Sequence, residues 1–267
     1  MKNEISLDTV CAELSYAMDV EEPKNSAEAN SQITQYVDER LNGGKVDRVF
    51  MYNPDAIAQW IEDKYPALFA EMSKHAELTV PLRSVMPCVT PVCFGTMYTG
   101  AQPEVHGIQS YTKPVISIDT IFDALIRVGK KPVILSYGNS SLSKIYLERN
   151  MDYYIFETLD EVNAKTAQLI LEDTYDFYVV YNGNYDSAMH KNGPESVVAL
   201  SEIRANGRMF STFVEMIKDH WKQHNTLVGF AMDHGCHEID ENSGSHGLDM
   251  EEDLNIIHSY TVIPAEK

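Results

Sequence analysis

Short apolar runs separated by helix-like segments constrain the fold of this chain more than any other feature of its sequence. Four of them read as buried strands, at residues 46–52 (VDRVFMY), 131–137 (KPVILSY), 175–181 (YDFYVVY) and 226–232 (TLVGFAM). Weaker strand candidates lie at residues 78–82, 153–156 and 260–263. Buried strands that alternate with helices are typical of a parallel sheet covered on both sides. We therefore predict an α/β fold with a mostly parallel sheet and helices on both faces.

Helical patterns fill the intervals between these runs. They lie at residues 56–64, 66–74, 119–128, 159–171 and 195–221, the last with an expected interruption at Asn206-Gly207. Residues 1–45 are acidic and contain two more such patterns, at 5–18 and 29–41. We expect them to form a helical N-terminal arm before a main domain at residues 46–267. Residues 241–247 (ENSGSHG) are expected to form a mobile loop.

The charge balance narrows the range of partners. The 267 residues include 21 Lys and Arg but 40 Asp and Glu, which gives a formal net charge of -19. Such a chain repels nucleic acids and anionic membranes, so we expect neither as a partner. No stretch approaches the roughly 18 apolar residues of a membrane span, and the acids near the start are atypical of a signal peptide. We expect a cytoplasmic protein, and a homo-oligomer is possible.

The four cysteines are Cys11, Cys88, Cys93 and Cys236. They form no CxxC pair, which argues against a zinc-ribbon or thioredoxin-like site and favours reduced thiols. Two of them flank Thr90, a residue with a distinctive context.

Thr90 is followed by Pro91, and this pair predicts a helix with Thr90 as the N-cap and proline at the first helical position. The helix should end at Thr99-Gly100. Free backbone N–H groups and the positive end of the helix dipole favour anions at such a position. The simpler alternative is that Thr90 only caps the helix.

Residues that can bind metal ions follow the predicted strands. They are Asp55 after the first strand, Asp186 and His190 after YDFYVVY, Asp233-His234-Gly235 after TLVGFAM, and His246 in a Gly-Ser-His-Gly segment. Asp186 and His190 are four residues apart and would share one helix face. Taken singly, these elements are equally compatible with a solvated helix face, a capped turn and surface histidines. Their joint occurrence at the carboxyl ends of strands, where ligands of such sheets bind, favours a site.

In this combination the sequence resembles the alkaline phosphatase superfamily, most closely its type I phosphodiesterase/nucleotide pyrophosphatase branch. The nucleophile segment matches at Pro87, Thr90, Thr96, Thr99, Gly100, Pro103, His106, Gly107 and Ile108. The branch's second motif resembles residues 186–194 (DSAMHKNGP), with Met189 in place of its glycine. The Asp-His-Gly and Gly-x-His-Gly elements also agree. The resemblance extends from about residue 46 to the end of the chain.

The resemblance implies an alkaline phosphatase-like catalytic domain that holds two divalent metal ions. One ion would be bound by Asp55, Thr90, Asp233 and His234, and the other by Asp186, His190 and His246. Nitrogen and carboxylate ligands without thiolate suit zinc, with manganese as the second choice. Thr90 would be the nucleophile that attacks a small phosphorylated substrate and forms a phosphothreonine intermediate.

Three departures from the family pattern bear on specificity. Cys93 replaces an Asn that the branch uses near the phosphate, and Ala56 replaces the usual Gly after Asp55. The short interval from His234 to His246 leaves no room there for a large cap domain. Phosphodiesters, phosphomonoesters, pyrophosphates and phosphonates therefore all remain possible substrates.

Other members of the superfamily, and one function without catalysis, are the alternatives to this assignment. Residues 88–92 (CVTPV) lack the proline spacing and the arginine of a sulfatase, and the chain is too short for the second domain of the mutase relatives. A silent relative that only binds metal or nucleotide is the alternative from another functional class. Among the other polar residues, His106 reads as structural, His75, His220, His224 and His258 as surface or core residues, and His237 and Asn139 as possible substrate contacts.

Overall fold

An eight-stranded sheet forms the centre of the computed structural model, which describes residues 2–240 and 242–266. Its strands lie in the order β1-β3-β10-β7-β2-β6-β4-β5. They are β1 (Ile5–Ser6), β2 (Arg48–Pro54), β3 (Leu78–Arg83), β4 (Pro132–Tyr137), β5 (Asp152–Phe156), β6 (Phe177–Asn182), β7 (Thr226–Ala231) and β10 (Asn255–Ile263). The strands from β7 to β5 in this order are parallel, whereas β10 runs antiparallel to both neighbours. The predicted mostly parallel sheet is confirmed.

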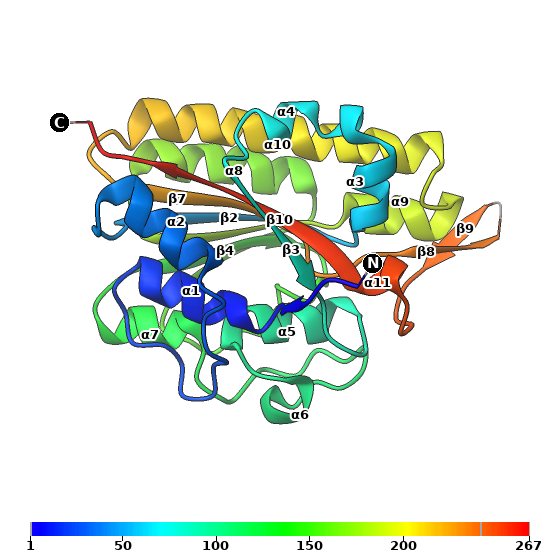
Figure 1. Cartoon of the computed structure of the whole chain (residues 1–267), viewed down its shortest axis with the longest axis horizontal. Coiled ribbons are helices and arrows are strands. Elements are labelled where there is room, and N and C mark those ends of the chain that lie inside the picture. The colour runs from blue at the N-terminus through cyan, green and yellow to red at the C-terminus, as the bar shows by residue number, and fades with distance from the viewer. Residues whose placement is uncertain (1, 241, 267) are drawn as a thin grey trace.

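Helices cover both faces of this sheet, as predicted (Figure 1). One face carries α3 (Gln59–Lys64), α4 (Ala70–Ser73), α8 (Leu159–Glu172), α9 (Asn184–Asn192) and α10 (Val197–His220), with the 3-10 turn η1 (Pro66–Leu68). The other carries α1 (Thr9–Ala17), α5 (Thr90–Thr99), α6 (Pro103–His106) and α7 (Ile121–Arg127), and α2 (Gln32–Leu41) packs on α1. Within the described residues, no helix is long and apolar enough to cross a membrane.

The apolar runs are apolar throughout because both faces of the sheet are buried. Adjacent residues of a strand point to opposite faces. Tyr178 packs against Trp221 at the end of α10, with ring centroids 5.0 Å apart. The preceding residue, Phe177, packs against Tyr98 of α5 and Phe122 of α7 on the other face. A strand in this position has no solvent-facing side, which explains why hydrophobic alternation is absent from its sequence.

The predicted interruption of the long helix at Asn206-Gly207 is wrong. Helix α10 is continuous from Val197 to His220, and both residues are buried in it. Asn206 accepts a hydrogen bond from the Tyr52 hydroxyl at 3.1 Å and donates one to the Glu202 carbonyl at 2.9 Å. Tertiary hydrogen bonding and packing here outweigh the low helix propensity of an Asn-Gly pair.

The two chain ends take part in the sheet. Strand β1 pairs parallel with β3, so the helical pattern predicted at residues 5–18 is wrong at its first two positions. Strand β10 begins at Asn255 rather than at residue 260, and it lies between β3 and β7. Helix α1 packs against α5 and α7, and α2 contacts β3 and β10, so the N-terminal segment is in contact with the main sheet. The domain boundary at residue 45 stays a prediction.

A small hairpin occupies part of the segment predicted to be a mobile loop. Strand β8 (His237–Asp240) pairs antiparallel with β9 (Ser243–Ser245), and a short helix, α11 (Glu251–Leu254), follows. Glu241 lies outside the described residues. The hairpin projects from the end of the sheet at which β2, β6 and β7 finish (Figure 1).

The topology brings the predicted metal ligands to one edge. Strands β7, β2 and β6 are neighbours and parallel, so their carboxyl ends meet. Asp55 follows β2, helix α9 with Asp186 and His190 follows β6, and Asp233-His234 follows β7.

Candidate two-metal centre

The first cluster lies buried at the ends of β2 and β7. It consists of Asp55, Asp233 and His234, and the Thr90 hydroxyl lies beside it. His234 Nε2 is 3.4 Å from Asp55 Oδ1 and 3.4 Å from Asp233 Oδ2. Thr90 Oγ1 is 3.3 Å from His234 Nε2 and 3.4 Å from Asp55 Oδ2. These four side chains are the set predicted for the first ion.

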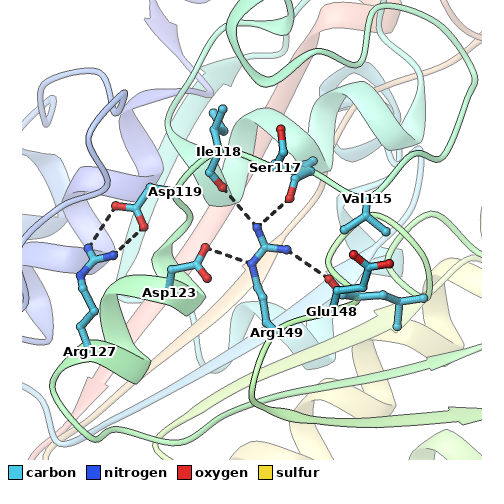
Figure 2. Close-up of a pocket in the computed structure, with 10 residues that line it drawn as sticks. Val115, Ser117, Ile118, Asp119, Asp123, Arg127, Glu148 and Arg149 are labelled. Atoms are coloured by element: carbon cyan, nitrogen blue, oxygen red, sulfur yellow. Dashed lines mark hydrogen bonds and ion pairs between the residues drawn. The ribbon is translucent and has the colours of Figure 1, made fainter.

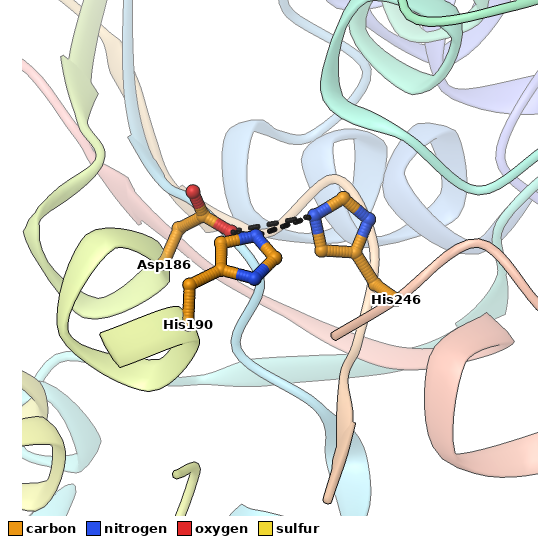
Figure 3. Close-up of side chains that lie close together, drawn as sticks. All are labelled: Asp186, His190 and His246. Atoms are coloured by element: carbon orange, nitrogen blue, oxygen red, sulfur yellow. Dashed lines mark hydrogen bonds and ion pairs between the residues drawn. The ribbon is translucent and has the colours of Figure 1, made fainter. Parts of the chain in front are cut away.

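The second cluster consists of Asp186, His190 and His246 (Figure 3). His190 Nε2 is 3.2 Å from Asp186 Oδ1 and 3.2 Å from His246 Nε2. His246 Nε2 is 3.4 Å from the same carboxylate oxygen. Helix α9 supplies Asp186 and His190 from one face, as their spacing predicted, and His246 approaches from the segment after β9.

The two clusters are adjacent. The rings of His234 and His246, one from each cluster, have centroids 4.1 Å apart. The seven side chains predicted to bind metal thus converge from five separate segments of the chain. Within residues 2–240 and 242–266, these are the groups of three or more acidic, histidine or cysteine side chains that could hold an ion.

The spacing of the ligand atoms fits metal binding. Zinc ligands about 2.0–2.1 Å from a tetrahedral ion lie roughly 3.3–3.4 Å from one another. The contacts between ligand atoms given above, 3.2–3.5 Å, match that separation. In addition, Asp233 Oδ2 is fully buried and accepts no regular hydrogen bond from any described residue. A buried carboxylate oxygen without a hydrogen bond is unfavourable unless a cation compensates it.

The three histidines are oriented through their second ring nitrogen. Nδ1 of His234 lies 2.9 Å from the Gly235 carbonyl, Nδ1 of His190 lies 2.9 Å from the Gly244 carbonyl, and Nδ1 of His246 lies 3.0 Å from the Cys88 carbonyl. Because a carbonyl oxygen only accepts, each Nδ1 carries the proton and donates it. The lone pair of the neutral ring is then on Nε2, the nitrogen that faces the cluster in each case.

Burial sets the electrostatics of the first cluster. It raises the pKa of Asp55 to about 7, with the Asp186 charge adding to the effect. Burial and the Asp55 charge likewise raise the pKa of Asp233 well above its usual range. The pKa of His234 falls to about 3, again mainly through burial. Two carboxylates next to a neutral imidazole therefore lack a compensating positive charge.

Ion pairing sets the electrostatics of the second cluster. Burial favours the protonated form of Asp186, but His190 and His246 outweigh it and lower the pKa of this carboxyl. Conversely, the Asp186 carboxylate raises the pKa of His190, and it raises that of His246 against the opposing effect of burial. Protonation of His190 or His246 can therefore neutralise the negative charge of Asp186 in this cluster.

The start of helix α5 differs in one detail from the prediction. The N-cap is Val89, the helix begins at Thr90, and the Thr90 side chain makes no capping hydrogen bond. Its hydroxyl is directed at Asp55 and His234 instead. The predicted end of the helix is confirmed, since Gly100 follows Thr99 with a φ of 69° in the left-handed region.

Two further residues complete the first cluster. The Tyr181 hydroxyl, at the end of β6, donates a hydrogen bond to Asp55 Oδ2 at 2.5 Å. Sequence reasoning missed Tyr181 because it lies within an apolar run. Ala56, the replacement for the family glycine, has a φ of 65°, and its N–H points at Asp233 Oδ1 at 3.3 Å. An alanine in the left-handed region is strained by about 1 kcal/mol, which the buried contacts of this turn offset.

Three cysteines lie close to the site but not among its ligands. Burial raises the pKa of Cys88 and of Cys236 to about 12, and it raises that of Cys93 well above its usual range. Cys93 Sγ lies 3.1 Å from Ser84 Oγ, and the Ser84 hydroxyl donates to the Asp233 carbonyl at 2.6 Å. The residue that replaces the family Asn is therefore a buried thiol beside Ser84, which in turn contacts the backbone of Asp233.

The remaining candidates take other positions. His106 is buried against Thr96, His75 and His258 are buried, His224 pairs with Asp173, and His220 is exposed. This agrees with their interpretation as core or surface residues. His237 Nδ1 lies 2.7 Å from Asp253 Oδ1, and the Asn139 carbonyl accepts a hydrogen bond from Lys113.

A separate cavity of about 550 Å³ lies near α7 (Figure 2). Its cationic side chains are already paired. Arg149 bonds Asp123 Oδ2 and the carbonyls of Ile116, Ile118 and Leu147, and Arg127 pairs with Asp119 through two nitrogens. None of the seven predicted ligands lines this cavity. The two clusters are therefore the stronger candidate site.

Comparison with known proteins gives the fold. No family model matches the sequence, and a search of curated proteins finds no match. In contrast, solved structures match clearly. Murine ectonucleotide pyrophosphatase/phosphodiesterase 5 aligns with 71% of this chain and 57% of its own, at 17% identity and a TM-score of 0.56. Its inactive Thr-to-Ala variant in complex with AMP aligns over the same shares, at 16% identity and a TM-score of 0.55.

A bacterial enzyme is similar to the same extent. Phosphonoacetate hydrolase from Sinorhizobium meliloti 1021, in complex with phosphonoformate, aligns with 74% of this chain and 59% of its own, at 16% identity and a TM-score of 0.52. The chain has the alkaline phosphatase-like fold. This confirms the fold that the motifs implied. The chain spans less than two thirds of each of these proteins, and its described residues contain no large cap domain.

Proposed function

We propose that this protein is a metal-dependent hydrolase of phosphoric esters, of the phosphodiesterase/nucleotide pyrophosphatase type, that acts through a phosphothreonine on Thr90. The observation that carries the proposal is the convergence of two ligand clusters, with contacts of 3.2–3.5 Å, beside the Thr90 hydroxyl. The inactive Thr-to-Ala variant of the murine protein, bound to AMP, supports a role for a threonine in this fold.

The clusters would hold two divalent ions, zinc in the first instance and manganese as the alternative. Asp55, Thr90, Asp233 and His234 would bind one, and Asp186, His190 and His246 the other. Bound ions would lower the pKa of the Thr90 hydroxyl and stabilise the attacking and leaving oxygens of an in-line displacement.

Thr90 would carry the covalent step. Its Oγ1 forms a bond to phosphorus while the bond from phosphorus to the leaving oxygen breaks, and the leaving oxygen takes up a proton from water as the alcohol or phosphate departs. The Thr90 proton is directed at Asp55, whose oxygens lie 3.4 and 3.5 Å from Oγ1. Water then attacks the phosphothreonine, the bond from Oγ1 to phosphorus breaks, and Thr90 is restored. Tyr181 would hold Asp55 in place through its hydrogen bond.

The substrate we propose is a small phosphorylated molecule, because the net charge of -19 opposes binding of polyanions. Among small esters, the diester or pyrophosphate of a nucleotide is our first choice. A phosphomonoester or a phosphonate is the alternative, because the buried Cys93 cannot supply the amide donor of the related diesterases. The similarity to phosphonoacetate hydrolase favours including a phosphonate in the test.

The test offers four substrates side by side to protein loaded with zinc or manganese. They are p-nitrophenyl phosphate, bis-p-nitrophenyl phosphate, a nucleotide p-nitrophenyl ester and phosphonoacetate. We expect the nucleotide ester to be turned over fastest. Two bound ions per chain without turnover of any substrate would instead support a silent metal-binding or nucleotide-binding relative.

The role of Thr90 is tested by acid quenching during turnover, followed by mass spectrometry. The wild type should show a phosphoryl or nucleotidyl adduct on Thr90, and Thr90→Ser should show it on serine, with reduced turnover. Thr90→Ala should lose turnover by about 10⁴-fold or more, because no nucleophile remains. Thr99→Ala, which removes a buried hydroxyl nine residues further along α5, is the control and should retain turnover. Full activity of Thr90→Ala would refute this role.

A further inference from the structure

Asp253 is a fully buried acidic residue of α11 that belongs to neither cluster. Both of its side-chain oxygens are used. Oδ1 accepts a hydrogen bond from Nδ1 of His237 at 2.7 Å, and Oδ2 accepts one from the backbone N–H of Leu248 at 2.9 Å. Charge-assisted bonds to a buried carboxylate are among the stronger ones in proteins, so these two points of the chain are firmly held.

The two residues that Asp253 holds lie on either side of His246. Leu248 follows His246 by two positions, and His237 is paired across the β8–β9 hairpin with Ser245, the residue before His246. The next pair in this hairpin is Glu238 with Gly244. The Gly244 carbonyl accepts the bond that orients His190. The side chain of Asp253 therefore fixes the segment that carries His246 and that supplies the carbonyl orienting His190.

The first cluster is connected to Asp253 by backbone atoms instead. The Asp253 carbonyl accepts a hydrogen bond from the Gly235 N–H at 2.7 Å, and the Gly235 carbonyl accepts the bond that orients His234. A Cβ at Gly235 would lie 2.2 Å from the Glu252 carbonyl oxygen. Only glycine allows this close approach, which explains the glycine after Asp233-His234.

We infer that Asp253 is a positioning residue that holds the second cluster through its carboxylate and the first cluster through its backbone carbonyl. This inference rests on the proposed metal-dependent function. It makes an asymmetric prediction, because a side-chain substitution breaks only the connection to the second cluster. Residues outside the ligand shell that orient ligands typically change metal affinity by about 10–100-fold when they are replaced.

The experiment measures zinc binding by equilibrium dialysis in two backgrounds. His234→Ala leaves the second cluster as the intact site, and His190→Ala leaves the first. Asp253→Asn is added to each, because an amide oxygen can accept one of the two hydrogen bonds but its nitrogen cannot accept the other. Glu252→Gln, an equal change of charge at the exposed neighbouring position, is the matched control.

We expect Asp253→Asn to raise the zinc Kd of the second cluster by about 10–100-fold and that of the first by less than about threefold. His237→Gln should act in the same direction as Asp253→Asn, and Glu252→Gln should change neither. An unchanged Kd of the second cluster, or an equal loss at both clusters, would overturn the inference. If either background binds no ion, Asp253→Asn is made alone in the wild-type protein and its bound zinc is counted. A fall from two bound ions to one supports the inference, and two retained ions overturn it.

The proposed function and this inference fail in different ways. Wild-type protein that binds no zinc and no manganese would refute the proposed function, and the inference with it. Wild-type protein that binds two ions, with Asp253→Asn indistinguishable from it, would refute the inference alone. Circular dichroism of each metal-free variant checks that the chain is folded.

Discussion

The two ligand clusters touch each other, yet their surroundings differ sharply. In the first cluster, Asp55, Asp233 and His234 are each at most 1% exposed. In the second, the side chains of Asp186 and His190 are 20% and 40% exposed. The first cluster lies at the ends of central strands of the sheet, whereas the second comes from a helix and from the segment after a surface hairpin.

This difference in burial determines how each cluster tolerates the loss of a cation. Burial raises the pKa values of Asp55 and Asp233 and lowers that of His234, so without a cation the first cluster is driven towards uncharged forms. The second forms ion pairs between Asp186 and its two histidines. A site built on rigid strand ends is thus preorganised for a cation and unfavourable without one, while the more exposed site is adaptable.

The largest effect that we expect from replacing a single histidine of either cluster is a loss of turnover, and it differs between the clusters. His234→Ala should lower turnover by about 10³-fold or more, because the Thr90 hydroxyl lies 3.3 Å from His234 and loses its electrostatic partner. The loss of turnover in His190→Ala should be at least tenfold smaller, since solvent can take the place of this half-exposed side chain. Steady-state kinetics at saturating zinc, with zinc content measured on the same samples, provides the comparison.

Equal losses of turnover in the two variants would contradict this asymmetry. Lys191→Ala, a change at the exposed position after His190, is the control and should leave both turnover and zinc content unaltered.

The sequence predicted the architecture well where a segment's surroundings follow from its own residues. The four strong apolar runs all form internal strands, because a strand buried on both faces needs apolar side chains throughout. The prediction failed where contacts with residues distant in the chain determine the local structure. Strand β1 is two residues long and depends on β3, and the buried contacts of Asn206 keep α10 continuous.

The site was predictable for a related reason. Asp55, Asp186 and Asp233 each follow a strand, and the carboxyl ends of parallel neighbours meet. What the sequence could not reveal is which apolar-looking or remote residues support these ligands. Tyr181 is part of a strand, and Asp253 is nineteen positions beyond His234 in a short helix, where nothing in the local pattern marks it.

A smaller effect should appear in the stability of the metal-free protein. Asp233→Asn should stabilise it by about 1–3 kcal/mol, because a buried carboxylate oxygen without a hydrogen bond is replaced by a neutral amide that can donate to Asp55. Asp186→Asn should instead destabilise it by up to about 1 kcal/mol, since it removes partly exposed ion pairs to two histidines. Urea denaturation in the presence of a chelator measures both.

The essential result is that the two substitutions change the stability of the metal-free protein in opposite directions. Both variants should bind fewer zinc ions than the wild type, so that added zinc stabilises them less. If both substitutions destabilise the metal-free protein, the first cluster is not the more strained of the two.

The smallest expected effect is a change in the pH dependence of stability at His106, a histidine that belongs to neither cluster. His106 accepts a hydrogen bond from the Ile108 N–H at Nδ1 and therefore donates from Nε2 to the Thr96 hydroxyl at 3.1 Å, so neither nitrogen is left for a metal. Burial lowers the pKa of His106 to about 4. This pKa in the folded state lies below the value of about 6.5 in the unfolded state. The contribution of His106 to the free energy of unfolding is therefore complete above pH 6.5 and is lost as the pH falls towards 4. His106→Gln should therefore lose about 1–2 kcal/mol less stability than the wild type between pH 7 and 4.5, measured by urea denaturation without metal. Its zinc content at pH 7 should equal that of the wild type, whereas a variant that lost an ion would place His106 among the ligands after all.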